Sequence, residues 1–289
     1  MDNLIHKHTI KCKYCSSADI VKYGTFQGMQ RYFCKSCRRK FADNDALPKM
    51  KTPVWIISLA LNCHYKGMSL RTIQNEINQR HGAYYAQSSI YNWIIRFSKE
   101  AVRQAKTFQP EISDRWFLSI TPAVSGNRRL CFGDIFDTNS KYLLSTHLFE
   151  TGTKTEMLNL ITATGFASRI NHQHTVTILF SDTFSTNKPG LINHDISGID
   201  PYVFETADMN TVEEFHRILK KRDSIVCGFK NINNAQALSE AWQVHYNFIT
   251  ENDTAKHSAP AQKTGKPLFQ NWEDIIKRSS TKKPVTESP

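Results

Sequence analysis

Apolar residues recur at helical spacing between Pro53 and Phe97 and predict three short helices. Pro53 suits the first turn of a buried helix that ends before Gly67. Ser69 caps the second helix, and Gly82 ends it. The apolar positions expected to face inward in the second and third helices are Leu70, Ile73, Ile77, Ile90, Trp93, Ile94 and Phe97.

Three helices with a tight turn before the last one are typical of a helix-turn-helix domain, which we place at residues 52–106. The third helix, which starts at Ser88 or Ser89, would be its recognition helix. Any three-helix bundle has the same periodicity, so the pattern alone leaves both interpretations open. The residues that this recognition helix would expose to DNA are Ser89, Tyr91, Asn92 and Arg96.

From Arg115 the pattern changes to three successive extended segments, then a helix, another strand and more helices. The three successive strands predict an antiparallel meander with a turn at residues 125–127. This element order is that of a ribonuclease-H-like domain, a mixed sheet with flanking helices, placed at residues 109–278. The predicted fold class is therefore α/β and multidomain. The expected segments are strands over 116–124, 129–137, 142–148 and 175–180 and helices over 154–166 and 211–221.

Two Cys-x-x-Cys pairs near the N-terminus, Cys12 with Cys15 and Cys34 with Cys37, have the spacing of a four-cysteine zinc site. Two disulfides or a redox pair are the alternatives. The chain opens on polar residues without a secretory signal, so we expect a reducing setting that disfavours disulfides. A thioredoxin-type redox motif would need a βαβ context that is not visible. We therefore expect a structural zinc ribbon over residues 1–45. The other cysteines, Cys63, Cys131 and Cys227, are interpreted as small core residues.

The excess positive charge lies in the first third of the chain. Residues 1–108 carry 18 Lys/Arg against 6 Asp/Glu, whereas the remainder carries 19 against 20. Tyr14, Tyr23, Phe26, Tyr32 and Phe33 are interleaved with these cations, which is typical of a surface that contacts a phosphate backbone. A solvated basic surface, with the aromatic residues packed around the metal, is the alternative. The candidate DNA contacts in the ribbon are Lys13, Arg31, Lys35, Arg38, Arg39 and Lys40.

Beyond these patterns, the large domain contains short motifs in a characteristic order and spacing: Ser145 to His147, Thr153 to Thr155, Asn210, Glu213 and His216, Leu219 to Arg222, Gly228 to Lys230, Ala235 and Gln236, Trp242, His245 to Ile249 and Asn271 to Ile275. Through these motifs the chain from Cys12 to about Ile276 resembles the DDE/D insertion-sequence transposases, many of which carry a zinc ribbon and a helix-turn-helix in front.

The resemblance implies three carboxylates that hold two Mg²⁺ ions for phosphoryl transfer. Asp182 matches the second acid and Glu213 the third. The first position, in the strand that begins near Trp116, holds Ser119, whose hydroxyl is a weak ligand for Mg²⁺. Asp134 is a possible substitute across the predicted hairpin, either on the same face as Ser119 or one residue out of register.

Other positions also depart from the family pattern. Glu214 stands where the family has a basic residue, and residues 250–252 replace an Arg-Pro-His motif; both changes add negative character near the expected DNA. The run Lys220 to Arg222 is either a solvated helix face or lies close to DNA. The histidines expected to pack or to form hydrogen bonds are His147, His216 and His245.

Three functions therefore compete: an active transposase, a DNA-binding derivative whose cleavage is impaired or lost, and a non-catalytic scaffold that dimerises. Ser119 at the first acid position weighs against the active transposase, and the basic N-terminal third with its four cysteines favours the DNA-binding derivative over the scaffold. We expect structural zinc, Mg²⁺ only if the catalytic site is functional, duplex DNA with terminal-inverted-repeat-like ends, and a homodimer. No apolar run is long enough to span a membrane, and residues 279–289 read as a disordered tail. The resemblance implies a cytoplasmic, nucleoid-associated prokaryotic protein.

Overall fold

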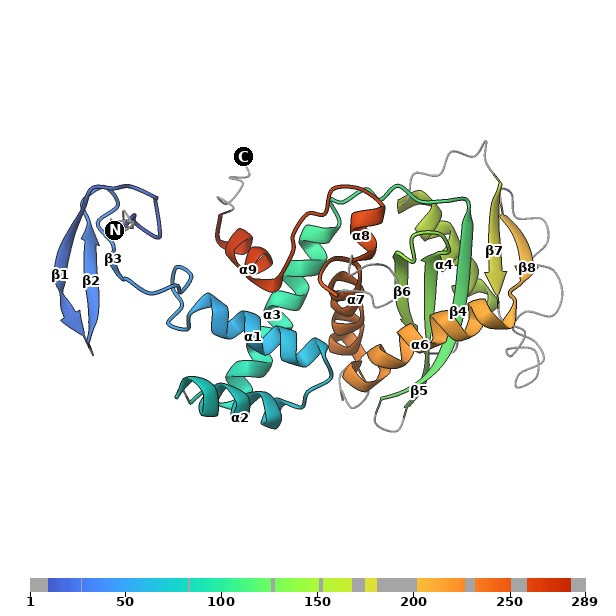
Figure 1. Cartoon of the computed structure of the whole chain (residues 1–289), viewed down its shortest axis with the longest axis horizontal. Helices are drawn as coiled ribbons and strands as arrows, with labels where there is room; N and C mark the ends of the chain where they lie inside the picture. Colours follow the sequence, from blue (N-terminus) through green and yellow to red (C-terminus); the bar gives the residue numbers. More distant parts are fainter. Residues whose placement is uncertain are drawn as a thin grey trace, which may run out of the picture.

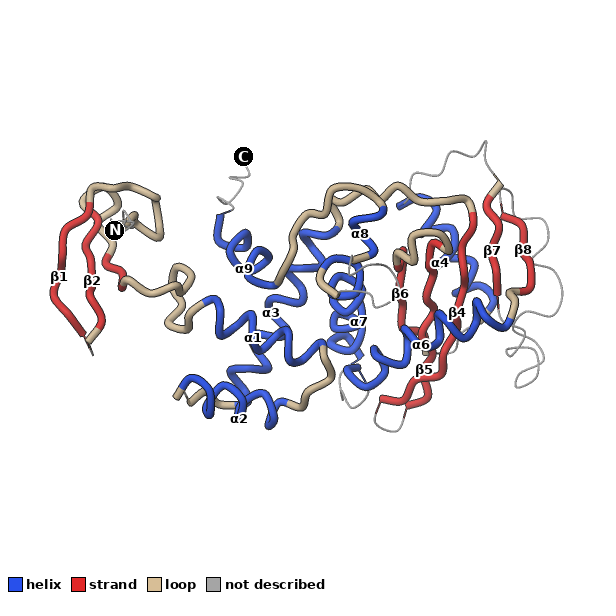
Figure 2. Tube along the Cα trace, viewed as in Figure 1, coloured by secondary structure: helices blue, strands red, loops and turns tan. Residues whose placement is uncertain are grey.

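The computed structural model places a small ribbon, a group of helices and a five-stranded sheet along the long axis of the molecule (Figure 1). Strands occur at the two ends, in the ribbon and in the large sheet (Figure 2). Among the helices of the described residues, none is long and apolar enough to cross a membrane. The structure describes residues 10–26, 28–82, 84–125, 128–150, 153–167, 175–180, 202–226, 232–250 and 259–281.

The N-terminal ribbon (residues 10–45) is a three-stranded antiparallel sheet with its own small core. Tyr32 stacks on Phe41 at a centroid distance of 5.7 Å, and both pack against Cys12 and Cys34. This cluster is separate from the one that fills the helices and the sheet, so the ribbon depends on its own few residues. Its strands are β1 (Ile20–Phe26), β2 (Met29–Cys34) and β3 (Lys40–Ala42).

Three helices follow the ribbon, as the apolar spacing predicts. The Ser69 hydroxyl accepts a hydrogen bond from the Thr72 N–H at 3.2 Å, and Gly82 ends the second helix with a left-handed φ of 60°. The third helix begins at Gln87, earlier than the predicted Ser88 or Ser89, and continues well past Phe97. The helices are α1 (Val54–Tyr65), α2 (Leu70–His81) and α3 (Gln87–Ala105).

The large sheet has the strand order β6-β5-β4-β7-β8. The first three strands in sequence form an antiparallel meander, while β7 runs parallel to β4 and β8 parallel to β7. This is the ribonuclease-H-like arrangement and confirms the predicted mixed sheet; β8 is a strand that the sequence analysis missed. The strands are β4 (Arg115–Ser125), β5 (Arg128–Asp137), β6 (Leu143–Phe149), β7 (Val176–Phe180) and β8 (Tyr202–Thr206).

Successive side chains of β4 point to opposite faces of the sheet and therefore pack against two different layers of helices. Trp116 and Leu118 pack on the side of α4 (Lys154–Ala167), together with Met157. Phe117 faces the opposite side, where Phe215 of α6 (Met209–Val226) stacks on it at 4.6 Å. The remaining helices are α7 (Ile232–Phe248), α8 (Pro260–Lys263) and α9 (Trp272–Thr281).

Helix α7 covers the edge strand β6 with amide side chains. Asn247 accepts a hydrogen bond from the Leu143 N–H at 2.9 Å and donates to the Leu143 carbonyl at 2.8 Å. Gln236 accepts from the Leu148 N–H at 2.7 Å. An edge strand otherwise presents unpaired backbone groups to other chains, so α7 closes this edge.

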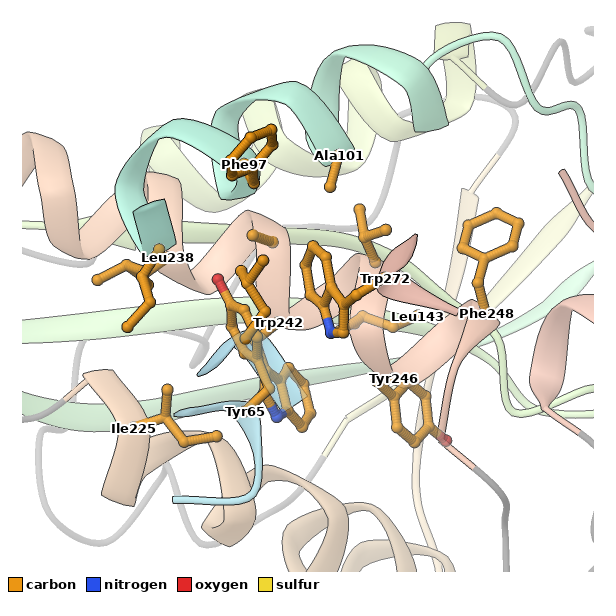
Figure 3. Packing of buried hydrophobic residues seen from close by; sticks show 14 of the residues in the cluster. Tyr65, Phe97, Ala101, Leu143, Ile225, Leu238, Trp242, Tyr246, Phe248 and Trp272 are labelled. Atoms are coloured by element: carbon orange, nitrogen blue, oxygen red, sulfur yellow. The ribbon is translucent and has the colours of Figure 1, made fainter. Parts of the chain in front are cut away.

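The helical group and the sheet share one hydrophobic core. Tyr65 of α1 stacks on His245 of α7 at 5.4 Å and on Trp272 of α9 at 5.1 Å. The Trp272 indole N–H donates to Nδ1 of His245 at 3.3 Å. Figure 3 labels Tyr65 and Trp272 of this cluster together with Phe97 of α3. Since α9 extends to Thr281, the chain is helical at the start of the tail predicted to be disordered from residue 279, and the rest of that tail lies outside the described residues.

Two buried histidines, His245 in this cluster and His64 of α1, should make the stability of the fold sensitive to acid. Burial lowers the pKa of His245 to about 3 and that of His64 to about 4, whereas an unfolded chain titrates its histidines near 6.5. Below that value the unfolded chain binds protons that the folded chain does not. We therefore expect the free energy of unfolding to fall by about 1.4 kcal/mol per pH unit for each histidine between about pH 6 and 5. Denaturant titrations over this range measure the slope.

His245→Gln removes one titrating group and keeps an acceptor for the Trp272 indole. We expect it to flatten the dependence of unfolding free energy on pH, and His64→Gln to do the same. A slope that neither substitution changes would contradict this assignment.

Candidate metal centre and nucleic-acid interface

The four ribbon cysteines converge on one point, in the arrangement that a metal ion requires. The Sγ atoms of Cys12 and Cys37 lie 3.5 Å apart, those of Cys15 and Cys34 lie 3.6 Å apart, and all four lie within 4.8 Å of one another. In a tetrahedral site with metal–sulfur bonds of about 2.3 Å, neighbouring sulfurs lie about 3.8 Å apart. The quartet therefore fits a tetrahedral thiolate site.

Tight turns bring the two cysteine pairs together. The residues just after each pair, Ser16 and Arg38, adopt left-handed φ values of 60° and 58° and donate their N–H groups to the carbonyls of Cys12 and Cys34. A hydrogen bond from the backbone N–H of Cys37 lowers the pKa of Cys34 to about 6. Burial raises the pKa of Cys37 to about 12. One thiolate forms readily, and a bound cation is needed before all four can be ionised together.

The outer face of the ribbon sheet combines an exposed aromatic ring with cations. Tyr23 is 46% exposed, and Nζ of Lys40 lies 3.9 Å from its ring centroid. The Arg31 guanidinium carbon lies 5.7 Å from the centroid of the Tyr23 ring. The ring centroids of Tyr23 and Phe33 are 6.3 Å apart. Phe26, at the tip of the hairpin, is 60% exposed. Stacking rings and cations on one face can bind both the bases and the phosphates of a nucleic acid.

The ribbon cations predicted to contact DNA occupy different environments. Lys35, Arg38, Arg39 and Lys40 are exposed, whereas Arg31 is half-buried. Lys13 turns inward, because its ammonium group donates to the backbone and side-chain oxygens of Asn44, and burial lowers its pKa. The Lys13 contacts hold the segment that leaves the ribbon.

In the predicted recognition helix, some of the candidate DNA contacts are exposed, whereas one of them contacts α7. Asn92 and Arg96 are exposed on α3, and Ser89 is half-buried. The Tyr91 hydroxyl accepts a hydrogen bond from Nδ2 of Asn234 in α7 at 2.8 Å, so this side chain joins α3 to α7. The exposed residues at the start of α3 remain available to a partner.

In the large sheet, the position expected to hold the first acid is fully buried. Ser119 pairs directly with Asp134 across the β4–β5 hairpin, and both side chains are 0% exposed. Of the two registers considered for Asp134, the structure has the one that places it on the same face as Ser119. The Ser119 hydroxyl has no hydrogen-bond partner among the described residues. Glu213 is exposed near the start of α6, and Asp182, like Cys227, lies outside the described residues.

Arg222 of α6 forms an ion pair with Asp134 at this position. Its Nη1 donates to both carboxylate oxygens, at 2.5 and 2.6 Å, and its Nη2 donates to the Thr121 hydroxyl at 3.0 Å. The guanidinium carbon lies 3.8 Å from the Phe132 ring centroid. Arg222 is itself 0% exposed, so the expectation of a solvated or DNA-facing run over residues 220–222 is wrong for this residue.

These residues do not fit a divalent metal ion. Burial raises the pKa of Asp134, which opposes the effect of the adjacent guanidinium, and both of its oxygens already accept hydrogen bonds. A dication about 4 Å from the guanidinium would meet a repulsion of roughly 8 kcal/mol at an effective dielectric constant of about 20. Among the described residues, the ribbon quartet is the group of metal-ligating side chains that converges.

Glu214, which departs from the family pattern, also has a structural partner. Its carboxylate lies 2.8 Å from Nζ of Lys141, and both side chains are partly buried. Lys141 adopts a left-handed φ of 63° in the turn between β5 and β6. The negative charge at Glu214 therefore ties α6 to this turn.

No protein-family model matches the chain, and no curated protein matches it either. Among solved structures it is similar to the HTLV-2 integrase catalytic core domain in complex with magnesium, with 14% identity and a TM-score of 0.37 over 53% of this chain and 95% of that one. A chain of the simian T-cell lymphotropic virus intasome in complex with the PP2A regulatory subunit B56 gamma matches with 16% identity and a TM-score of 0.42, over 80% and 79%. The catalytic core domain of BIV integrase matches with 17% identity and a TM-score of 0.34, over 58% and 95%. Likenesses this weak carry no argument, and the fold rests on strand order and register.

Sequence reasoning missed Arg222, although a signal for it existed. The buried positions of α6 include Val212, Phe215 and Leu219, and the same helical spacing leads to residue 222. A cation on the apolar stripe of a helix implies a buried counter-charge.

Replacing one member of this ion pair should be far more harmful than replacing both. Arg222→Met leaves the Asp134 carboxylate buried without a partner, so we expect the free energy of unfolding to fall by about 3–5 kcal/mol. The double variant Asp134→Leu/Arg222→Met should recover most of that loss. Lys277→Met, which removes an exposed pair with Glu273, is the control and should change stability by no more than about 0.5 kcal/mol. Equal losses in the single and double variants would contradict the ion pair.

Proposed function

We propose that the protein is a DNA-binding protein of the DDE/D insertion-sequence transposase type in which strand cleavage is impaired or lost. The observation that carries this proposal is the joint occurrence of two features. The cysteine quartet organises a basic ribbon with Tyr23 and Lys40 on its outer face. The ribonuclease-H-like sheet, in contrast, has a serine and an internal ion pair where the first acid is expected.

In this proposal the quartet holds structural zinc, because four thiolates in a tetrahedral arrangement suit that ion. The ribbon contacts the phosphate backbone of duplex DNA through Arg38, Arg39 and Lys40. Helix α3 adds contacts from Asn92 and Arg96, in the manner of a helix-turn-helix recognition helix. The DNA would be a terminal-inverted-repeat-like end, bound by a homodimer in the cytoplasm of a prokaryotic cell.

An active transposase that uses Asp134 as its first acid is the main alternative. The contact of Asp134 with Arg222 weighs against it, because the guanidinium already pairs with both oxygens of this carboxylate and would repel a bridging dication. A non-catalytic scaffold is the other alternative. The exposed cations and rings of the ribbon favour DNA binding over this role.

DNA binding should depend on the metal-bound ribbon. Cys34→Ser removes one of the four ligands, so we expect it to lose stoichiometric zinc and to lower DNA affinity while the helices and sheet stay folded. Cys131→Ser, outside the quartet, is the matched control. Metal analysis under reducing conditions, circular dichroism and fluorescence anisotropy with the DNA end of the parent element measure the three quantities.

The affinity of the full chain should fall by orders of magnitude between about 50 and 200 mM salt, and Lys40→Gln should reduce the slope of log K against log salt by about 0.9. Undiminished binding after deletion of residues 1–43 would refute the ribbon as the DNA-binding element.

No strand cleavage is expected on the same DNA with Mg²⁺ or Mn²⁺. Efficient cleavage that Asp134→Asn abolishes would establish the active alternative.

A further inference from the structure

The centre of the sheet face under α6 has the oxygen atoms of a cation site. Ser119 and Thr121 project from β4, Asp134 from β5 and Thr146 from β6, and the strand register places all four on the same face. Phe180, the last residue of β7, pairs with Leu118, immediately before Ser119. This is the place in the sheet where the resemblance puts the first metal-binding acid.

The cation at this place is part of the protein chain. Nη1 of Arg222 lies 2.5 and 2.6 Å from the two oxygens of Asp134 and 3.4 Å from the Thr146 hydroxyl. Nη2 donates to the Thr121 hydroxyl, and the Thr146 hydroxyl lies 3.1 Å from that of Ser239 in α7. Apart from the Ser119 hydroxyl, which has no partner among the described residues, the oxygens that would face a metal ion therefore already take part in hydrogen bonds within the protein.

Packing fixes the guanidinium at this place. Arg222 continues the buried stripe of α6 that contains Phe215 and Leu219, and its guanidinium lies over the Phe132 ring. A surface arginine could swing away and admit an ion, but this side chain is fully buried.

We propose that Arg222 is a built-in cation that takes the place of a divalent metal ion in this domain. It neutralises Asp134 and connects α6 to three strands, so the domain folds without a metal ion at this position. The inference deepens the proposed function, since it names the group that excludes Mg²⁺. It also means that Ser119→Asp alone does not restore a metal site, because Arg222 would pair with the new carboxylate as well.

Thermal unfolding of the full chain, with and without millimolar Mg²⁺ at matched ionic strength, tests the proposal. The variants are wild type, Ser119→Asp, Ser119→Asp/Arg222→Met and the matched neutral control Ser119→Asn/Arg222→Met. Two facing carboxylates without the guanidinium need a cation, so we expect Mg²⁺ to raise the Tm of Ser119→Asp/Arg222→Met by several degrees. The other three proteins should not respond.

Three results would overturn the proposal: a Mg²⁺-dependent rise in the Tm of wild type that Asp134→Asn removes, a rise in Ser119→Asp alone, or no rise in a folded Ser119→Asp/Arg222→Met. The wild-type and Ser119→Asp measurements decide the matter even if the double variants do not fold. DNA affinity is measured on wild type in parallel. Loss of DNA binding there would refute the proposed function without altering the result on Mg²⁺.

Discussion

The ion pair between Arg222 and Asp134 is the constraint on which the arrangement of the large domain depends. A buried carboxylate on β5 has to be compensated, and the guanidinium that does so comes from α6. The same guanidinium contacts Thr121 on β4 and lies within 3.4 Å of the Thr146 hydroxyl on β6. One side chain thus fixes the helix relative to all three strands of the meander, in a core that is otherwise largely apolar.

The negative groups at the two ends of the molecule, the ribbon thiolates and the Asp134 carboxylate, are balanced by cations from different sources. In the ribbon, four thiols lie within 4.8 Å of one another, and their full ionisation requires a cation from solution. In the sheet, the chain supplies its own cation at the position where a metal ion is expected. Between them, the shared core of α1, α3, α7 and α9 connects the helical group to the sheet through Tyr65, His245 and Trp272. Folding of the ribbon would therefore depend on zinc, whereas folding of the helices and the sheet would not.

Several features could be predicted because they depend on local chemistry. The spacing of Cys12, Cys15, Cys34 and Cys37, the cap at Ser69 and the termination at Gly82 need no tertiary information. The hairpin register followed from the turn and the strand alternation to within one residue, and the structure selects the direct pairing of Ser119 with Asp134.

The remaining features depend on contacts between residues distant in the sequence. Helical spacing places Arg222 on the buried stripe of α6, but its partner Asp134 is 88 positions away, and no local pattern identifies it. Lys13 and Tyr91 have residue types that suit DNA contacts, but both are partly buried and form hydrogen bonds with Asn44 and Asn234 of the protein itself. Strand β8 became recognisable only through its parallel pairing with β7.

Anomalous X-ray scattering from crystals grown with zinc and Mn²⁺ would test the central claim most directly. The account predicts a zinc peak at the centre of the Cys12, Cys15, Cys34 and Cys37 quartet and no manganese peak within coordination distance of Asp134. A manganese peak bound to Asp134, with the Arg222 guanidinium displaced from the carboxylate, would contradict it.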